Sequence, residues 1–191
     1  FKNNYNLNGP FSLEAWIKPN ATNGTIFSRK DNAVNNKGYD LSLSGGSLVF
    51  NYGSGSISTG NIINTSRWFH VAVTFDGTNY KLYVDGVLKN TVSGSAPQTT
   101  PNNIEAILGA IDQSPPGDPV NYFTGWMDEF RVWNRALNVQ HIRQMMNQEI
   151  KDFDGVNVGG EVILTKIYGV DTNQDGVYVE EDLLFWANLV G

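Results

Sequence analysis

The alternation of apolar and polar residues predicts short β-strands along most of the chain. Phe11, Leu13, Ala15 and Ile17 occupy every second position and therefore share one face of a strand, which Pro19 ends. Further strands are predicted over residues 25–28, 39–43, 48–52, 68–75, 80–84, 87–92, 104–110 and 122–133. Clusters of Gly, Asn and Ser separate them, as in a turn-rich all-β domain.

Turn chemistry fixes how three of these strands connect. Residues 76–79 form a hairpin loop, and Asp85-Gly86 is a preferred pair for a two-residue hairpin turn. The stretch 68–92 is therefore predicted to be a meander of three strands. The spacing of apolar residues becomes helical over 138–149, where Asn138 is a suitable N-cap, so one short helix is expected to close the fold.

The character of the chain changes after Ile150. Residues 151–160 are rich in Asp and Gly, 161–167 are a possible strand, and 180–190 are a short apolar helix candidate. We expect a β-sandwich over 1–150 and a linker or spacer over 151–191, which is too short for a core of its own. Because the chain begins with Phe1, we expect it to be a piece of a longer protein.

Composition narrows the possible partners. The net charge of −6 leaves no basic stripe for nucleic acid or for an anionic membrane surface. The chain has no cysteine, which excludes disulfides, thiolate catalysis and cysteine-bound metals. No apolar run is long enough to insert directly into a membrane.

Five ordered motifs, which span about residues 7–148, resemble one known family. They are FSLEAWIKP at 11–19, GYDLSL at 38–43, WFHVAVTFDG at 68–77, LYVDG at 82–86 and GWMDEFRVWNRAL at 125–137. The family is that of the laminin-G-like and concanavalin-A-like jelly rolls. The resemblance implies an antiparallel β-sandwich and an extracellular binding or adhesion role, with a glycan or cell-surface protein as partner and often with calcium.

The sequence departs from the family pattern at its start. Family members usually have an earlier strand with a Phe-Asp-Gly-like turn, whereas here only residues 1–8 precede the first motif. Either that strand is cut off, or another chain or segment completes the sheet. The tail adds a second resemblance, because residues 147–166 followed by 183–189 look like the spacer between tandem repeats of long bacterial surface adhesins. We therefore expect one repeat with its spacer, located at the cell surface beside neighbouring repeats of the same polypeptide.

A loop in the tail has the spacing of a calcium site. Positions 1, 3, 5, 7 and 12 of an EF-hand loop fall on Asp171, Asn173, Asp175, Val177 and Asp182. A glycine stands at position 6, where the loop turns sharply, and Asp at the last position resembles dockerin-type loops. The sequence predicts bound calcium here. The alternative is an Asx-rich turn before a capped helix, without an ion.

Asp128 is a second, weaker calcium candidate. It shares parity with Phe130 and Val132, so a regular strand would point its carboxylate into the core. A buried carboxylate needs hydrogen bonds or a cation. Related jelly rolls often bind a structural calcium near this strand, and the alternative is a carboxylate bonded to the backbone of a neighbouring strand.

Aromatic residues are the candidates for contact with a sugar. Core or inter-sheet packing is the expectation for each strand tryptophan. Trp16 and Trp133 alternate with the most apolar residues of their strands, so their side chains are expected on the opposite face and are the better surface candidates. Tyr122 is a loop candidate. The expected ligand-binding rim consists of the long polar loop at 31–37 with the loop at 93–103 or the loop at 112–121.

The sequence does not favour an enzyme. No strand has carboxylates at alternate positions, as glycosidases of this fold class require, and no Gly-x-Ser-x-Gly elbow is present. His70 is expected to be structural and His141 solvated. The leading hypothesis is a non-catalytic extracellular binding or adhesion module. The alternatives are a structural spacer repeat of a long surface protein and the carbohydrate-binding module of a glycosidase.

Overall fold

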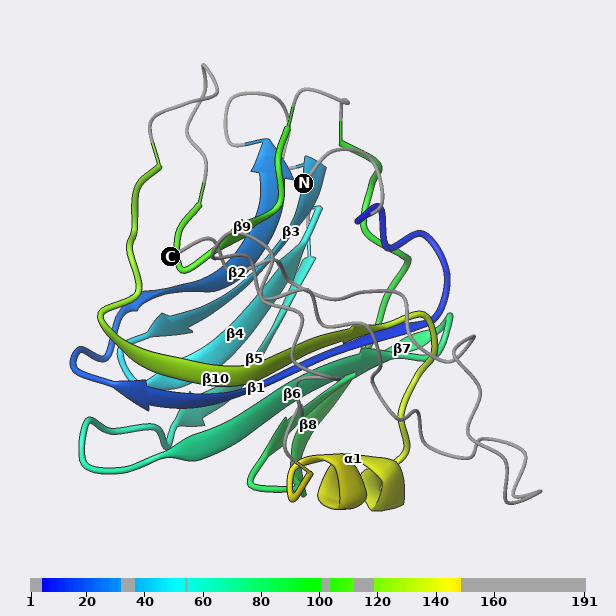
Figure 1. The fold of residues 1–191 in the computed structure, drawn as a ribbon. Helices are drawn as coiled ribbons and strands as arrows, with labels where there is room; N and C mark the ends of the chain where they lie inside the picture. The colour runs from blue at the N-terminus through cyan, green and yellow to red at the C-terminus, as the bar shows by residue number, and fades with distance from the viewer. Residues whose placement is uncertain (1–4, 32–36, 54, 101–103, 112–118, 149–191) are drawn as a thin grey trace, which may run out of the picture.

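Two five-stranded antiparallel sheets face one another in the computed structural model, which describes residues 5–31, 37–53, 55–100, 104–111 and 119–148 (Figure 1). Sheet A has the strand order β10-β1-β6-β7-β8, and sheet B has the order β5-β4-β3-β2-β9. The strands are β1 (Phe11–Pro19), β2 (Gly24–Asp31), β3 (Lys37–Ser44), β4 (Ser47–Tyr52), β5 (Gly55–Asn61), β6 (Phe69–Phe75), β7 (Asn79–Val84), β8 (Val87–Ser93), β9 (Ile107–Leu108) and β10 (Gly125–Trp133). The predicted antiparallel β-sandwich is confirmed.

Most strands lie where the alternation predicts them, with three differences. The meander β6-β7-β8 is present, and its last turn has positive φ at both Asp85 and Gly86, as a twisted two-residue hairpin requires. Strand β5 was not predicted, because Ile57 is its only apolar residue. The strand expected over 104–110 is reduced to the two residues of β9, and the one expected over 122–133 begins only at Gly125.

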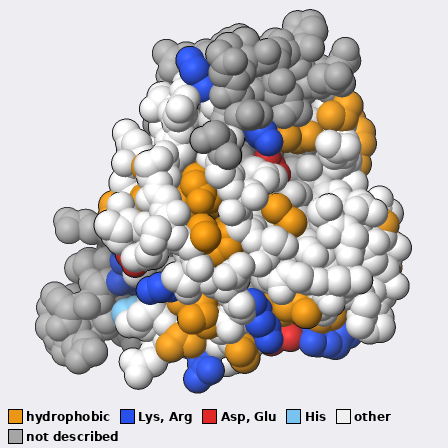
Figure 2. Space-filling view, turned by 180° about the vertical axis from the view of Figure 1, so that it is seen from behind, with side chains coloured by type: hydrophobic (Ala, Val, Ile, Leu, Met, Phe, Trp, Pro, Cys, Tyr) orange, Lys and Arg blue, Asp and Glu red, His pale blue; other side chains and the backbone are white. Residues whose placement is uncertain are grey.

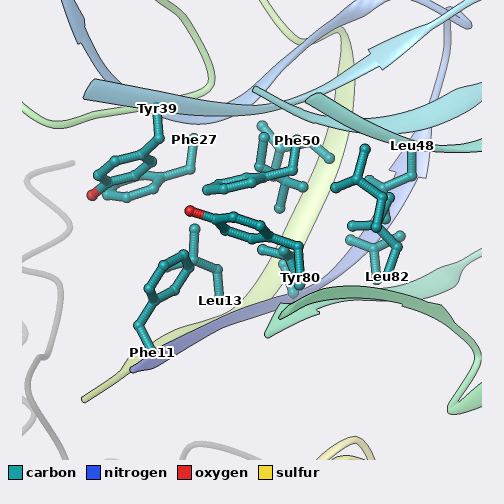
Figure 3. Close-up of a cluster of buried hydrophobic side chains, with 14 of the residues drawn as sticks. Phe11, Leu13, Phe27, Tyr39, Leu48, Phe50, Tyr80 and Leu82 are labelled. Carbon is teal, nitrogen blue, oxygen red and sulfur yellow. The ribbon is translucent and has the colours of Figure 1, made fainter. Parts of the chain in front are cut away.

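Large apolar side chains fill the space between the sheets (Figure 3). The labelled residues Phe11, Leu13, Tyr80 and Leu82 come from sheet A, and Phe27, Tyr39, Leu48 and Phe50 come from sheet B. The ring of Tyr80 stacks on that of Tyr52 with centroids 3.9 Å apart, which joins β7 to β4. Full burial of each such side chain contributes about 1.5–3 kcal/mol, so this layer holds the sheets together.

A β-bulge in β10 reverses which side chains face the core. Glu14 pairs with Arg131 and Trp16 pairs with Asp128, so one extra residue of β10 lies between the two pairs, where Glu129 has a φ of 53°. The prediction that Asp128 points inward is therefore wrong. Asp128 is exposed, and its carboxylate accepts a hydrogen bond from the Glu129 N–H at 2.8 Å.

The helix α1 (Val139–Met145) covers the outer face of sheet A (Figure 1). Asn138 is its N-cap, as predicted, and accepts a hydrogen bond from the N–H of His141. Ile142 and Met145 pack on Trp133, whose exposed fraction is 0%. The prediction that Trp133 lies on the surface is wrong: its parity does place it on the outer face, but the helix covers that face.

A buried polar cluster lies between α1 and sheet A. The Glu14 carboxylate accepts a hydrogen bond from Trp133 Nε1 at 3.1 Å, and it lies 3.7 Å from Arg131 Nη1 and 3.5 Å from His70 Nε2. Arg131 also donates to the carbonyls of Met145 and Gln148 at the end of the helix. The cluster therefore anchors the C-terminal end of α1 to the sheet.

Candidate ligand-binding site on the outer face of sheet B

A hollow of about 540 Å³ opens on the outer face of sheet B, which α1 does not cover. Strands β2, β3 and β4 form its floor, and the segment that precedes β10 forms one wall. Its lining residues are Asn23, Gly24, Thr25, Lys30, Asp40, Ser42, Leu43, Ser44, Val49, Asn51, Ile111, Asn121 and Tyr122. Uncharged polar side chains and backbone cover most of the molecule where it is seen from behind, with hydrophobic side chains in small separate groups (Figure 2).

Strand alternation produces the polar floor. In β3, Leu41 and Leu43 are buried in the core, so Asp40 and Ser42 between them face outward. Asp40 pairs with Asn51 of β4 and therefore brings its side chain next to that carboxamide. The register of β3 with β4 thus assembles one polar cluster from two strands.

Asp40 is the centre of that cluster. Its carboxylate accepts hydrogen bonds from Lys30 Nζ at 2.8 Å, Ser42 Oγ at 3.1 Å and Asn51 Nδ2 at 2.7 Å. The side chain of Asp40 is only 5% exposed, and that of Lys30 is 15% exposed. Three donors compensate the burial of the carboxylate and fix the positions of the surrounding groups.

The wall of the hollow is fixed by a close backbone approach. The N–H of Thr25 donates to the Asn121 carbonyl at 2.8 Å, and Asn121 adopts a positive φ of 53°. Gly24 has a φ of 142°, and a Cβ there would lie 2.7 Å from the carbonyl oxygen of Tyr122. Glycine is therefore required where this segment meets β2, and the neighbouring Tyr122 side chain is held at the rim with 63% of its surface exposed.

These groups suit a ligand with many hydroxyls. Lys30 and Asn51 keep N–H donors beyond those that Asp40 accepts, Ser42 Oγ and Asn51 Oδ1 supply acceptor oxygens, and the Tyr122 ring supplies a flat apolar surface. Lys30 and Asp40 neutralise each other, so the floor carries no net charge. Among the described lining residues Asp40 is the only carboxylate, whereas hydrolysis of a glycoside requires two.

Of the predicted aromatic candidates, the structure brings only Tyr122 to this hollow. Trp16 lies on the outer face of sheet A, donates from Nε1 to the Met146 carbonyl at 2.9 Å, and contacts the His70 ring edge to face. His70 itself has no exposed surface. Trp16 and Trp133 are thus both engaged by α1 and the residues that follow it.

Two other tryptophans lie on the surface instead. Trp126 is 55% exposed and Trp68 is 37% exposed. The expectation of core or inter-sheet packing is therefore wrong for Trp126, because the bulge at Glu129 turns its side chain outward. Trp68 falls just before β6 and outside the strand.

Sequence reasoning missed Lys30, Asp40 and Asn51. A usable signal exists, since Asp40-x-Ser42 and Asn51 occupy outward positions on strands joined by a tight Gly45-Gly46 turn. Of the loops expected to bind a ligand, residues 32–36, 101–103 and 112–118 lie outside the described part of the chain. Asn121 lines the hollow.

The predicted calcium loop, from Asp171 to Asp182, also lies outside the described residues. Within the described ranges, no three His, Asp or Glu side chains come together as a metal site. Asp128, the second candidate, faces solvent. No helix in the described part of the chain is long and apolar enough to cross a bilayer.

The two facing antiparallel sheets are a jelly-roll β-sandwich. The profile described as the concanavalin A-like lectin/glucanases superfamily, a laminin G family, matches residues 2–143. The chain belongs to this family.

Solved structures share the fold. A candidate carbohydrate-binding protein from Bacteroides ovatus is 23% identical with a TM-score of 0.60, and the match covers 75% of this chain and 42% of that one. The CBM40 domain of the Ruminococcus gnavus IT-sialidase, bound to α2,3-sialyllactose, is 15% identical with a TM-score of 0.59, covering 71% and 82%. Domain 4 of the extracellular arabinanase AbnA from Geobacillus stearothermophilus, in complex with arabinotriose, is 25% identical with a TM-score of 0.54, covering 72% and 66%.

A curated relative matches over a smaller part. The rat sushi, von Willebrand factor type A, EGF and pentraxin domain-containing protein 1 is 24% identical over 119 residues, which are 59% of this chain. The matched region is 3% of the length of that protein, so the similarity concerns one domain of a much larger polypeptide.

Proposed function

We propose that this domain is a non-catalytic extracellular module that binds a glycan in the hollow on the outer face of sheet B. The observation that carries the proposal is the cluster in which Lys30, Ser42 and Asn51 converge on Asp40, beside the exposed ring of Tyr122. Hydrogen-bonding groups held by a rigid sheet and an aromatic ring at the rim are the complement of a sugar, which has hydroxyls around its edge and apolar C–H faces.

The structures that share this fold support the same class of ligand. Two of them contain a bound oligosaccharide, sialyllactose in one and arabinotriose in the other. The charge-neutral floor of the hollow favours a neutral sugar, because neither Lys30 nor Asp40 is left unpaired for an ionic ligand. We also propose an extracellular or cell-surface location, which suits this role, and neighbouring repeats of the same polypeptide, which the resemblance of residues 147–166 and 183–189 to an adhesin spacer supports.

The test is a broad glycan array probed with the full chain, followed by calorimetry on the sugars that bind. Tyr122→Ala is expected to lower affinity about tenfold, because it removes the stacking surface, a loss of about 1.4 kcal/mol. Asn51→Ala is expected to lower it about three- to tenfold, since one or two hydrogen bonds are lost at about 0.5–1.5 kcal/mol each.

Two matched variants control this experiment. Tyr122→Phe keeps the ring and should retain most of the affinity, and Leu88→Ala removes an exposed apolar side chain of β8 outside the hollow. Absence of binding across the array would contradict the proposal and favour a structural spacer repeat. Binding that survives both Tyr122→Ala and Asn51→Ala would place the site elsewhere. A glycosidase domain encoded beside this one would identify it as a carbohydrate-binding module of that enzyme.

We also propose that residues 171–182 bind calcium through the ligand set Asp171, Asn173, Asp175, Val177 and Asp182. Support comes from the spacing alone. Calorimetric titration of chelator-treated protein with calcium should show saturable binding that Asp175→Ala removes. Heat that is absent, or unchanged in Asp175→Ala, would refute the site.

A further inference from the structure

Three side chains form a row across the outer face of sheet A beyond the area covered by α1: the exposed Trp126 and Trp68, and between them the half-buried Lys18. Lys18 of β1 pairs with Trp126 of β10. On its other side β1 pairs with β6, and this ladder ends at Ile17 and Phe69. Trp68 directly precedes Phe69 in the chain and therefore lies at the end of the ladder, on the side of Lys18. Phe69 points into the core, and Trp68 therefore lies on the outer face with the other two.

The backbone beneath this row is fixed. A Cβ on Gly125, whose φ is 146°, would lie 2.3 Å from the Lys18 carbonyl oxygen, so the two strands approach closely here. The N–H of Asn20 donates to the Thr124 carbonyl at 2.7 Å and joins the end of β1 to the start of β10. Trp126 is thus presented on a rigid ladder and not on a free loop, which lowers the entropic cost of binding.

We propose that Trp126, Lys18 and Trp68 form a second binding surface, which takes an acidic saccharide. Neighbouring strands lie about 4.8 Å apart, so the backbones of Trp126 on β10 and of Trp68, next to the first residue of β6, are separated by roughly 10 Å. That span is comparable with the length of a disaccharide. Each indole can pack against the apolar C–H face of one sugar ring while Lys18 between them meets a carboxylate.

The charge of Lys18 selects the ligand class. Its Nζ lies 5.2 Å from the centroid of the Trp126 ring, and it forms no ion pair with any carboxylate of the described residues. Lys30 in the hollow of sheet B, by contrast, is neutralised by Asp40. Asp128 is exposed on the same face, paired with Trp16 one row away, so it disfavours ligands with closely spaced negative charges.

The test is a titration of the full chain with 3′-sialyllactose, digalacturonate and a hyaluronan tetrasaccharide, followed by tryptophan fluorescence and calorimetry. Lactose and galactobiose are the neutral counterparts. At least one acidic sugar should bind saturably, at least tenfold more tightly than its neutral counterpart, and more weakly as salt is raised. Trp126→Ala and Lys18→Met should each lower this affinity at least tenfold. Thermal unfolding of both variants checks that they are folded.

The result for this second binding surface can be distinguished from the result for the hollow of sheet B. Tyr122→Ala and Asn51→Ala should leave binding of the acidic sugar unchanged, and Lys18→Met should leave binding at the hollow unchanged. The second surface is overturned if no acidic sugar binds, or if binding is lost with Tyr122→Ala and kept with Trp126→Ala. It is also overturned if light scattering shows a dimer that Trp126→Ala dissociates, because the row would then be a contact between copies.

Discussion

Replacement of Arg131 by methionine tests whether the polar cluster under α1 stabilises the domain. Arg131 is 2% exposed, lies 3.7 Å from the Glu14 carboxylate through Nη1, and contacts Glu129 at 2.6 Å through Nη2. Methionine preserves much of the apolar stem but removes the charge and the donors to the Met145 and Gln148 carbonyls. Glu14, with no exposed surface, would keep Trp133 as its only hydrogen-bond donor in the described structure.

The expected loss is large because a buried charge is left without its partner. Removal of one member of a buried ion pair costs about 3–5 kcal/mol. We expect a loss near the lower figure, since Glu14 keeps the Trp133 hydrogen bond. Against a total stability of about 5–15 kcal/mol for a domain, this is a substantial fraction.

Guanidinium chloride unfolding at neutral pH, followed by tryptophan fluorescence, measures the effect. The midpoint should fall while the slope of the transition stays unchanged. The double variant Glu14→Gln with Arg131→Met should be more stable than Arg131→Met alone, because the unpaired carboxylate is gone. A loss below about 1 kcal/mol, or a double variant no more stable than the single one, would refute the account of the cluster.

Three further predictions concern single residues. Gly24→Ala should destabilise the domain by about 1–3 kcal/mol and weaken sugar binding in the hollow, because it forces a side chain into a glycine-only conformation against the Tyr122 carbonyl. Denaturation and calorimetry that show unchanged stability and unchanged affinity would contradict this. Hydrogen bonds from the backbone of Asn79 and from Thr78 lower the pKa of Asp76 to about 2, so its contribution to stability is complete above about pH 4 and is lost as pH falls toward 2. In Asp76→Asn, the free energy of unfolding should fall less than in the unaltered protein as pH is lowered from about 4 toward 2. An equal fall in both proteins would contradict this prediction. Arg29 is fully buried, and its Nη1 and Nη2 have no hydrogen-bond partner in the described structure. Arg29→Met should therefore raise the free energy of unfolding by about 1–3 kcal/mol. A clear decrease would show that the buried charge is compensated.

Local patterns predicted most of the sandwich from the sequence. Phe11, Leu13, Ala15 and Ile17 all lie in the core, because a single regular strand repeats every two residues. The Asp85-Gly86 turn was predictable for a similar reason, since its backbone angles depend on the two residues themselves. Strand β5 was not predictable, because its place depends on pairing with β4 and not on its own polar sequence.

The prediction of side-chain direction from the sequence failed where that direction depends on contacts between residues far apart in the chain. The bulge at Glu129 inserts one residue and so reverses the direction of Trp126 and Asp128, and nothing in the local alternation marks it. Trp133 has the parity expected of an outer face, but α1 returns to cover it. The polar cluster in the hollow of sheet B depends on the register of three strands, so its members could be seen in the sequence while their meeting at Asp40 could not.

The short segment from Asn121 to Trp126 crosses from one sheet to the other. It places Tyr122 at the hollow on sheet B, bridged to Thr25, and Trp126 on the outer face of sheet A, paired with Lys18. Only four peptide units separate the two aromatic side chains, and both ends are tied to strand backbones. Substitution of a side chain at one face leaves this backbone, and so the other face, in place. Any ligand that did shift the ribbon would change both binding free energies by the same amount. Two sugars bound at once are therefore coupled only through the backbone of this ribbon.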